Sequence, residues 1–321
     1  MNPNGDIELG PISDRPLPHS MLDELVEDRV STSFGEIAVN VVGNASRPAM
    51  VTFHDLGQNA NSAFQSFFVF TDMASLAERF CVYHINAPGC EEDASTLPED
   101  YIYPSMEDLA TIVGSVVDHF GLKTFIGLGV GAGANVLARY ALRAPKIVDG
   151  LITINLTTQA CGWVEWGYHK LNVHYLKSRG MTNVTVDYLM WHHFGKEWKN
   201  YENDLVREYY QYFCHLANPR NLGMFLESYM NRSDMGLCRD DLTLSCPVLQ
   251  LVGVGSPHAE DTVYANSVLD PTKSNWMKIS DCGGLVLDER PEKATEAIIL
   301  FLQGIGYCMF YLLHNWIYLR K

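Results

Sequence analysis

Positive charge is scarce in this sequence of 321 residues. It carries 23 lysines and arginines against 38 aspartates and glutamates, which gives a formal net charge of −15. No stretch is rich in lysine or arginine, although a protein that binds the phosphates of nucleic acid needs a local surplus of these side chains. The composition therefore excludes nucleic acid as an expected partner.

Signals for secretion and for metal binding are also missing. The first twenty residues are polar and acidic, and they lack the basic start and apolar run of a secretory signal peptide. The eight cysteines include no C-x-x-C pair, the spacing typical of zinc and redox sites. We therefore expect reduced thiols, no metal, no cofactor and a cytoplasmic protein, with a membrane-associated fraction left open.

The carboxy terminus is the most apolar part of the chain. Few polar side chains interrupt residues 297–319, a length sufficient for a membrane-spanning helix of about 20 residues. Two glycines, Gly304 and Gly306, divide the stretch. We therefore favour a final core helix over residues 292–303 and a short apolar extension over residues 308–321. Peripheral membrane contact through this extension stays an open alternative.

Short apolar runs alternate with amphipathic segments along most of the chain. After a polar leader, residues 1–27, strands are predicted over residues 29–34, 36–42, 49–53, 80–85, 124–128, 150–154, 247–252 and 276–279. Continuous apolar strands separated by helices predict an α/β fold with a mostly parallel eight-stranded sheet. Residues 156–236 lack a clear strand and predict an inserted helical cap within a domain over residues 28–307.

The segment 125–135 reads Phe-Ile-Gly-Leu-Gly-Val-Gly-Ala-Gly-Ala-Asn. A strand, a sharp turn and a helix start are predicted here, which is the context of the G-x-S-x-G nucleophile elbow of hydrolases. The outer glycines are Gly129 and Gly133, but the centre is Gly131, followed by Ala132. Glycine accepts the turn but offers no nucleophile. The pattern therefore predicts that the elbow turn is present but that it carries no catalytic nucleophile.

The other members of a catalytic triad are also missing from their expected places. In hydrolases with this elbow the acid and then the histidine follow the nucleophile along the chain. Residues 253–256 contain no carboxylate, although Glu260 and Asp261 come soon after. Gly284 stands where the histidine is expected. Without a base, a displaced serine has no usual route to activation.

A motif that can supply a backbone N–H to an oxyanion hole is better preserved. His54-Asp55-Leu56-Gly57 follows the third predicted strand, where hydrolases often carry such a motif. We favour a simpler interpretation, in which His54 and Asp55 form a turn that satisfies its own backbone.

Several segments resemble the N-myc downstream-regulated protein family. The similarity lies in residues 51–57, 127–142, 150–155, 162–163, 246–248, 256–258, 269–272 and 301–307. It covers about residues 27–307. It implies an α/β-hydrolase-like fold without hydrolase activity, in a cytosolic adaptor linked to differentiation, growth control, stress responses and trafficking. Family members usually end in a polar phosphorylatable tail, which this apolar carboxy terminus does not match.

Two enzymatic alternatives are weaker. A hydrolase with a displaced nucleophile would use Ser256 or Cys282, but a free cysteine is usually a small buried residue. Dinucleotide binding is suggested by residues 127–132, which match G-x-G-x-x-A, with Asp149 downstream. We expect Asp149 to precede its strand rather than end one, which argues against this alternative.

The remaining signals favour structural roles. His192 and His193 lack the H-E-x-x-H order of a zinc helix, and Trp163, Trp166 and Tyr168 are expected to pack inside the cap rather than form a ligand cage. We therefore predict a non-catalytic adaptor that binds proteins, with a small molecule or lipid in the elbow pocket as the alternative. The degenerate site comprises the positions His54, Asp55, Gly57, Gly129, Gly131, Ala132, Gly133, Asp261 and Gly284.

Overall fold

The computed structural model describes residues 26–200 and 203–307. The apolar extension and all but the last two residues of the polar leader lie outside these ranges, so the expectations for them stay predictions. In the described ranges, no helix has the length and apolar character needed to cross a membrane.

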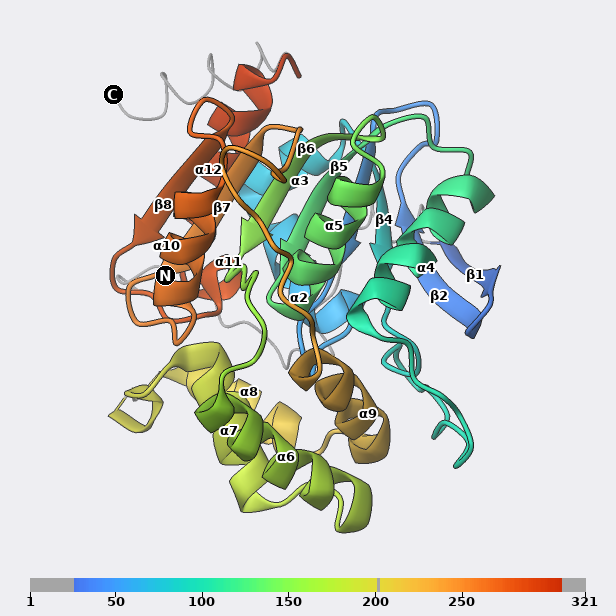
Figure 1. The fold of residues 1–321 in the computed structure, drawn as a ribbon, viewed down its shortest axis with the longest axis vertical. Coiled ribbons are helices and arrows are strands. Elements are labelled where there is room, and N and C mark those ends of the chain that lie inside the picture. The colour runs from blue at the N-terminus through green and yellow to red at the C-terminus, as the bar shows by residue number, and fades with distance from the viewer. Residues whose placement is uncertain (1–25, 201–202, 308–321) are drawn as a thin grey trace, which may run out of the picture.

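Eight strands form one twisted sheet in the order β1-β2-β4-β3-β5-β6-β7-β8 (Figure 1). Their bounds are β1 Val26–Thr32, β2 Gly35–Val42, β3 Ala49–Phe53, β4 Cys81–Ile85, β5 Phe125–Val130, β6 Val148–Ile154, β7 Val248–Gly253 and β8 Ser274–Ile279. Strands β3 to β8 run parallel, whereas β1 and β2 add antiparallel pairs at one edge. The predicted mostly parallel eight-stranded sheet is confirmed.

Helices cover both faces of the sheet, as continuous apolar strands require. Their bounds are α2 Ala60–Val69, α3 Thr71–Ala77, α4 Met106–His119, α5 Ala132–Arg143, α10 Ala259–Val268, α11 Val286–Glu289 and α12 Pro291–Gly304. Alternate strand residues enter two separate cores. Val51 and Phe53 of β3 pack with α4 and α5, whereas Met50 packs with α2, α3 and α12. This alternation gives each face of the sheet its own hydrophobic core.

The helical cap lies between β6 and β7 in the sequence. It comprises α6 Trp163–Ser178, α7 Asn183–Phe194, the 3₁₀ turn η1 Trp198–Asn200, α8 Asp204–Cys214 and α9 Pro219–Met230. Figure 1 shows these helices grouped beyond one end of the sheet, with α6 farthest from the strands. This is the end where β3 and β5 finish, so the cap covers the predicted elbow.

The prediction that the aromatic residues of α6 pack inside the cap is wrong for two of them. Trp163 is 91% exposed and Tyr168 is 55% exposed, whereas Trp166 is half-buried with the ammonium group of Lys170 over its ring. The inward face of α6 is formed instead by residues such as His169 and Leu176. The aromatic content of a helix does not tell which of its faces the fold covers, because that depends on the helical phase of each residue.

Candidate functional site

Gly131 forms the sharp turn that joins strand β5 to helix α5. Its φ of 51° lies in the left-handed region, and its N–H donates to the carbonyl oxygen of Ile154 (2.9 Å). Glycine adopts this conformation without steric cost because it has no Cβ. The turn of a nucleophile elbow is therefore present, without the hydroxyl that a hydrolase places at its centre.

The carboxylate of Asp55 occupies the space above this turn. Its Oδ1 atom accepts hydrogen bonds from the backbone N–H groups of Leu56 and Ala132, both at 2.8 Å, and the side chain is fully buried. In hydrolases with this elbow, the N–H after the nucleophile and one from the loop after the third strand form the oxyanion hole. The Asp55 carboxylate therefore accepts the hydrogen bonds of the two backbone N–H groups that, in a hydrolase, bind the substrate oxyanion.

A side chain at position 131 is incompatible with Asp55 in this position. A Cβ atom added to Gly131 would lie 2.1 Å from Oδ2 of Asp55. This distance is about half of an ordinary van der Waals contact between heavy atoms. The loss of the nucleophile and the presence of Asp55 are thus coupled by sterics.

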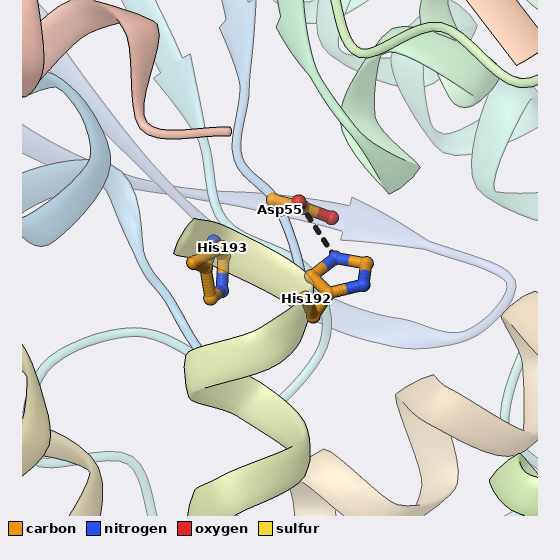
Figure 2. A group of neighbouring side chains, drawn as sticks. All are labelled: Asp55, His192 and His193. Carbon is orange, nitrogen blue, oxygen red and sulfur yellow. Dashed lines mark hydrogen bonds and ion pairs between the residues drawn. The ribbon is translucent and has the colours of Figure 1, made fainter. Parts of the chain in front are cut away.

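Helix α7 of the cap supplies the next two contacts (Figure 2). Nε2 of His192 lies 2.9 Å from Oδ2 of Asp55, and Nε2 of His193 donates to the carbonyl oxygen of Leu56 at 2.9 Å. Consecutive residues of a helix point about 100° apart. One turn of α7 therefore reaches both the Asp55 side chain and the backbone beside it.

The same helix end occupies the place where the triad histidine is expected. The N–H of Gly284 donates to the carbonyl oxygen of His193 at 2.7 Å. A Cβ atom at Gly284 would lie 2.5 Å from that oxygen. A histidine at this position would therefore force α7 away from the loop.

His54 connects the same loop to the neighbouring strand end. Its Nε2 accepts the N–H of Ala87 (2.9 Å), so its Nδ1 carries the proton and donates to the carbonyl oxygen of Asp55 (2.8 Å). The favoured interpretation of a self-satisfied turn described part of these contacts. It did not include the links from Asp55 to Ala132 and His192.

The other predicted positions have separate roles. Gly129 lies in β5 and Gly133 in the first turn of α5, whereas Gly57 lies against Leu189 and Phe213 of the cap. Asp261, on the first turn of α10, accepts from the hydroxyl of Thr157 at 3.4 Å. Asp261 is thus not one of the residues that bind Asp55.

Sequence reasoning overlooked His258 and judged His192 and His193 only as metal ligands. The rings of His192 and His258 lie 4.7 Å apart, and Nε2 of His258 is buried without a hydrogen-bond partner among the described residues. His258 stands in the Ser-Pro-His motif that carried part of the family resemblance. The place of His258 in this motif was the one feature of the sequence that pointed to it.

Burial and neighbouring charges set the protonation of these groups. Burial raises the pKa of Asp55, but His192, His193 and the N–H of Ala132 outweigh it and hold that pKa well below its usual range. Burial lowers the pKa of His193 to about 4 and that of His258 to about 3. At pH 7 the centre therefore holds an ionised Asp55 beside neutral His193 and His258.

Two groups of described side chains bring three potential metal-binding atoms within 4.8 Å of one another: Asp55, His192 and His193, and also Cys161, Glu165 and His169. Both groups are already hydrogen-bonded. Arg232 donates to both carboxylate oxygens of Glu165, at 2.9 and 3.1 Å. A metal at either group would have to displace these interactions, and the cost of separating a buried charge from its partner is high.

The two candidates for a displaced nucleophile, Ser256 and Cys282, are hydrogen-bonded within the fold. The hydroxyl of Ser256 donates to Oδ1 of Asn155 at 2.9 Å and accepts the backbone N–H of His258 at 3.1 Å. Burial raises the pKa of the Cys282 thiol well above its usual range, which disfavours the reactive thiolate. The Glu289 carboxylate beside Cys282 raises the pKa of the thiol further.

The dinucleotide alternative rested on Asp149, which was expected before its strand. That expectation is wrong, because Asp149 is the second residue of β6. Its carboxylate accepts a hydrogen bond from the hydroxyl of Tyr307 at 3.0 Å. Asp149 still lies at the start of its strand, opposite the end where a ribose-binding acid is placed.

A cavity of about 550 Å³ lies beside this centre rather than in it. It is formed between the loop of residues 89–94 and helix α8, and Gln58, Glu92 and Tyr212 contribute to its wall. Neither Asp55 nor Gly131 lines it. Directly above the elbow turn, the space is occupied by the Asp55 carboxylate.

Paired substitutions test the steric coupling between Gly131 and Asp55. Gly131→Ser should destabilise the fold by about 1–3 kcal/mol or more, because overpacking adds to backbone strain. Adding Asp55→Gly should recover part of that loss, since it removes the clash. Urea unfolding of the wild type, both single variants and the double variant measures the coupling. Strictly additive losses would contradict the geometry.

The stability of the protein should fall as the pH drops from about 6.5 to 4. His193 and His258 have lower pKa values when folded, so over this range the unfolded chain binds more protons. Asp55, whose folded pKa is also lowered, adds a further loss below about pH 4.

Replacing His258 by Asn should make this pH dependence shallower by about 1.4 kcal/mol per pH unit. The free energy of unfolding, measured in urea at several pH values, gives the slope. His215→Asn, the same substitution at an exposed position, is the matched control. Equal slopes in the wild type and in His258→Asn would refute the assignment.

Comparison with solved structures supports the fold. A thermophilic esterase from Thermogutta terrifontis is 18% identical, with a TM-score of 0.71 over 88% of this chain and 99% of the esterase. The α/β hydrolase MGS-M2 from a deep-sea metagenome is 12% identical, with a TM-score of 0.72 over 88% of this chain and 98% of that chain. At these identities the comparison shows a shared α/β-hydrolase fold.

Sequence comparison gives closer relatives. Human protein NDRG2 is 39% identical over 290 residues, covering 89% of this chain and 76% of NDRG2. Protein NDRG3 of Xenopus tropicalis is 41% identical over 290 residues, covering 88% of this chain and 73% of NDRG3. The model of the Ndr family matches residues 27–309. With the fold, the glycine-centred elbow and these relatives together, the chain belongs to the Ndr family.

Proposed function

We propose that this protein is a catalytically inactive member of the α/β-hydrolase fold that acts as a cytosolic adaptor for other proteins. The observation that carries the proposal is the Asp55 carboxylate, which accepts both N–H groups that would stabilise an oxyanion. Removing one such donor from an enzyme costs about 10²–10³ in kcat. Here both are engaged by the protein, and the elbow has no hydroxyl.

The cap supports the same proposal. In a lidded hydrolase the cap must leave room for a substrate above the nucleophile, and lid motion often gates turnover. Here the end of α7 bonds Asp55, Leu56 and Gly284 through His192 and His193. Opening the cap would break these bonds and leave a buried carboxylate without its partner, which is strongly unfavourable.

The biological setting is proposed from the family. Family membership and the absence of a hydroxyl at Gly131 favour a role in signalling, in differentiation, growth control, stress responses or trafficking, over metabolism. The folded domain would then present a rigid surface to protein partners in the cytoplasm. A weak hydrolase that uses Ser256 or Cys282 is the less favoured alternative, because the hydroxyl of Ser256 donates to an amide oxygen and because burial and the Glu289 carboxylate raise the pKa of the Cys282 thiol.

Ester hydrolysis tests the catalytic part of the proposal. The full chain should hydrolyse p-nitrophenyl acetate no faster than the same sample after heat denaturation, because no residue at the elbow can form an acyl intermediate. A rate clearly above the heated control that disappears in Ser256→Ala or Cys282→Ala would overturn the proposal and identify the nucleophile.

Affinity capture from cell extract tests the adaptor part. We expect reproducible protein partners for the intact chain and for a chain that ends at Tyr307, if the domain supplies the binding surface. Partners retained only by the intact chain would assign binding to residues 308–321 instead. If neither form retained a partner, the adaptor function would lose its support.

A further inference from the structure

The cavity of about 550 Å³ beside the Asp55 centre has the size of a ligand site. Pockets that bind small molecules commonly enclose about 300–1,000 Å³. The segment of residues 89–94 forms one wall, and the opposite wall is formed by helix α8 and the residues that lead from it into α9. The proposed function makes no use of this cavity.

Asn221, a buried residue of helix α9, holds the loop wall of the cavity in place. Its Nδ2 atom donates to the carbonyl oxygens of Gly89 (2.8 Å) and Ser95 (3.0 Å), and its Oδ1 atom accepts the N–H of Leu97 (2.9 Å). A Cβ atom on Gly89 would lie 2.7 Å from that Nδ2 atom, so glycine permits this close approach. The wall is thus formed before a ligand arrives, which lowers the entropic cost of binding.

The lining of the cavity is rich in carboxylates. Glu91, Glu92 and Asp93 lie on the loop wall, and Glu208 of α8 lines the other side. Among the described residues, no lysine or arginine lines the cavity, and His215 is the one lining side chain that can become positive. A cleft lined by charges of one sign attracts ligands of the opposite sign. The lining therefore favours a cation.

Part of this negative charge is already balanced within the fold. Arg29 of β1 forms an ion pair with Glu91 (3.0 Å), and Asn61 of α2 donates to Glu92. In the described ranges, the carboxylate of Asp93 has neither an ion pair nor a hydrogen-bond donor. The loop wall therefore keeps the capacity to accept hydrogen bonds from a ligand.

A buried amide in the lining also has an unused acceptor. Gln58 is 4% exposed and lines the cavity, and its Nε2 atom lies 3.4 Å from the hydroxyl of Tyr209. Within the part of the chain that the structure describes, its Oε1 atom accepts no hydrogen bond. Polar atoms of buried side chains normally have a partner. This oxygen therefore points to a ligand that donates hydrogen bonds.

The spacing of the carboxylates favours an elongated cation over a metal ion. Among the described residues, the groups that bring three potential metal-binding atoms within 4.8 Å of one another include none of the cavity carboxylates. A metal ion needs several such atoms in direct contact with it. A chain that carries several ammonium groups can reach carboxylates that lie apart, and its methylene groups can pack on apolar parts of the lining such as Leu222 and the ring of Tyr212.

We propose that this cavity binds a linear polyamine, a flexible chain in which methylene segments join positively charged amino groups. The N–H groups of the polyamine donate to Oε1 of Gln58 and to the carboxylates of Glu92 and Asp93. Hydrogen bonds between ionised groups are stronger than those between neutral groups. An ammonium group against the Tyr212 ring adds a cation–π interaction. This inference goes beyond the proposed adaptor function and does not depend on it.

Isothermal titration calorimetry of the full chain with spermine tests the proposal. The wild type should saturate at one spermine per chain, and butylamine, which has a single ammonium group, should bind more weakly. Glu92→Gln together with Asp93→Asn should weaken spermine binding about tenfold, because two partly exposed ion pairs are lost. Gln58→Leu should also weaken it about tenfold, because a hydrogen bond to a charged group is lost.

Matched controls separate the cavity from the acidic surface as a whole. Glu260→Gln with Asp240→Asn changes the net charge by the same amount at exposed positions outside the cavity, and it should bind spermine as the wild type does. Ala217→Trp adds a large ring to the lining without a change of charge and should abolish most binding. Ala45→Trp, at an exposed position elsewhere, should not. Circular dichroism melting of each variant confirms that the fold is intact.

Three results would overturn the proposal. The first is the absence of saturable spermine binding to the wild type. The second is an equal loss of affinity in the cavity variants and in the charge-matched control, which would indicate general attraction to an acidic protein. The third is tighter binding of a lysine-rich peptide than of spermine, lost in the same cavity variants, which would assign the cavity to a basic segment of a protein partner.

Discussion

The hydrogen bonds of the Asp55 carboxylate hold together the part of the structure that defines this protein. One oxygen accepts the N–H groups of Leu56 and Ala132, and the other faces His192 of the cap. A buried carboxylate is tolerated only when such partners replace water. The loop after β3, the elbow and the cap are therefore bound to one charged group, and each depends on the other two.

This arrangement explains how the elbow turn is kept with glycine at its centre. The left-handed turn at Gly131 still directs the N–H of Ala132 toward the carboxylate. In a hydrolase that N–H would bind the substrate transiently during turnover. In this protein it donates to Asp55 and stabilises the folded state. The elbow geometry is thus part of the packing between sheet and cap.

Much of the fold could be predicted from the sequence, because its strands are continuous apolar runs and its elbow has a dense glycine pattern. The hydrogen-bond partners of Asp55 could not be predicted from the sequence. His192 is 137 residues away from Asp55 in the sequence. It lies on helix α7, whose buried residues are spread around the helix rather than along one face. Neither hydrophobic periodicity nor residue spacing therefore relates His192 to Asp55. The exposure of Trp163 was missed for a similar reason, since composition alone does not tell which face of a helix is covered.

The separation between Asp55 and His192 also has a consequence for how the chain folds. Contacts between distant positions form late, because the entropy of closing a long loop must be paid before they contribute. During synthesis, Asp55 is made well before the elbow and long before α7. Strands β1 to β6 precede the cap in the sequence, whereas β7 and β8 follow it. The charged centre is completed only when α7 docks, so we expect cap docking to be a late step in folding.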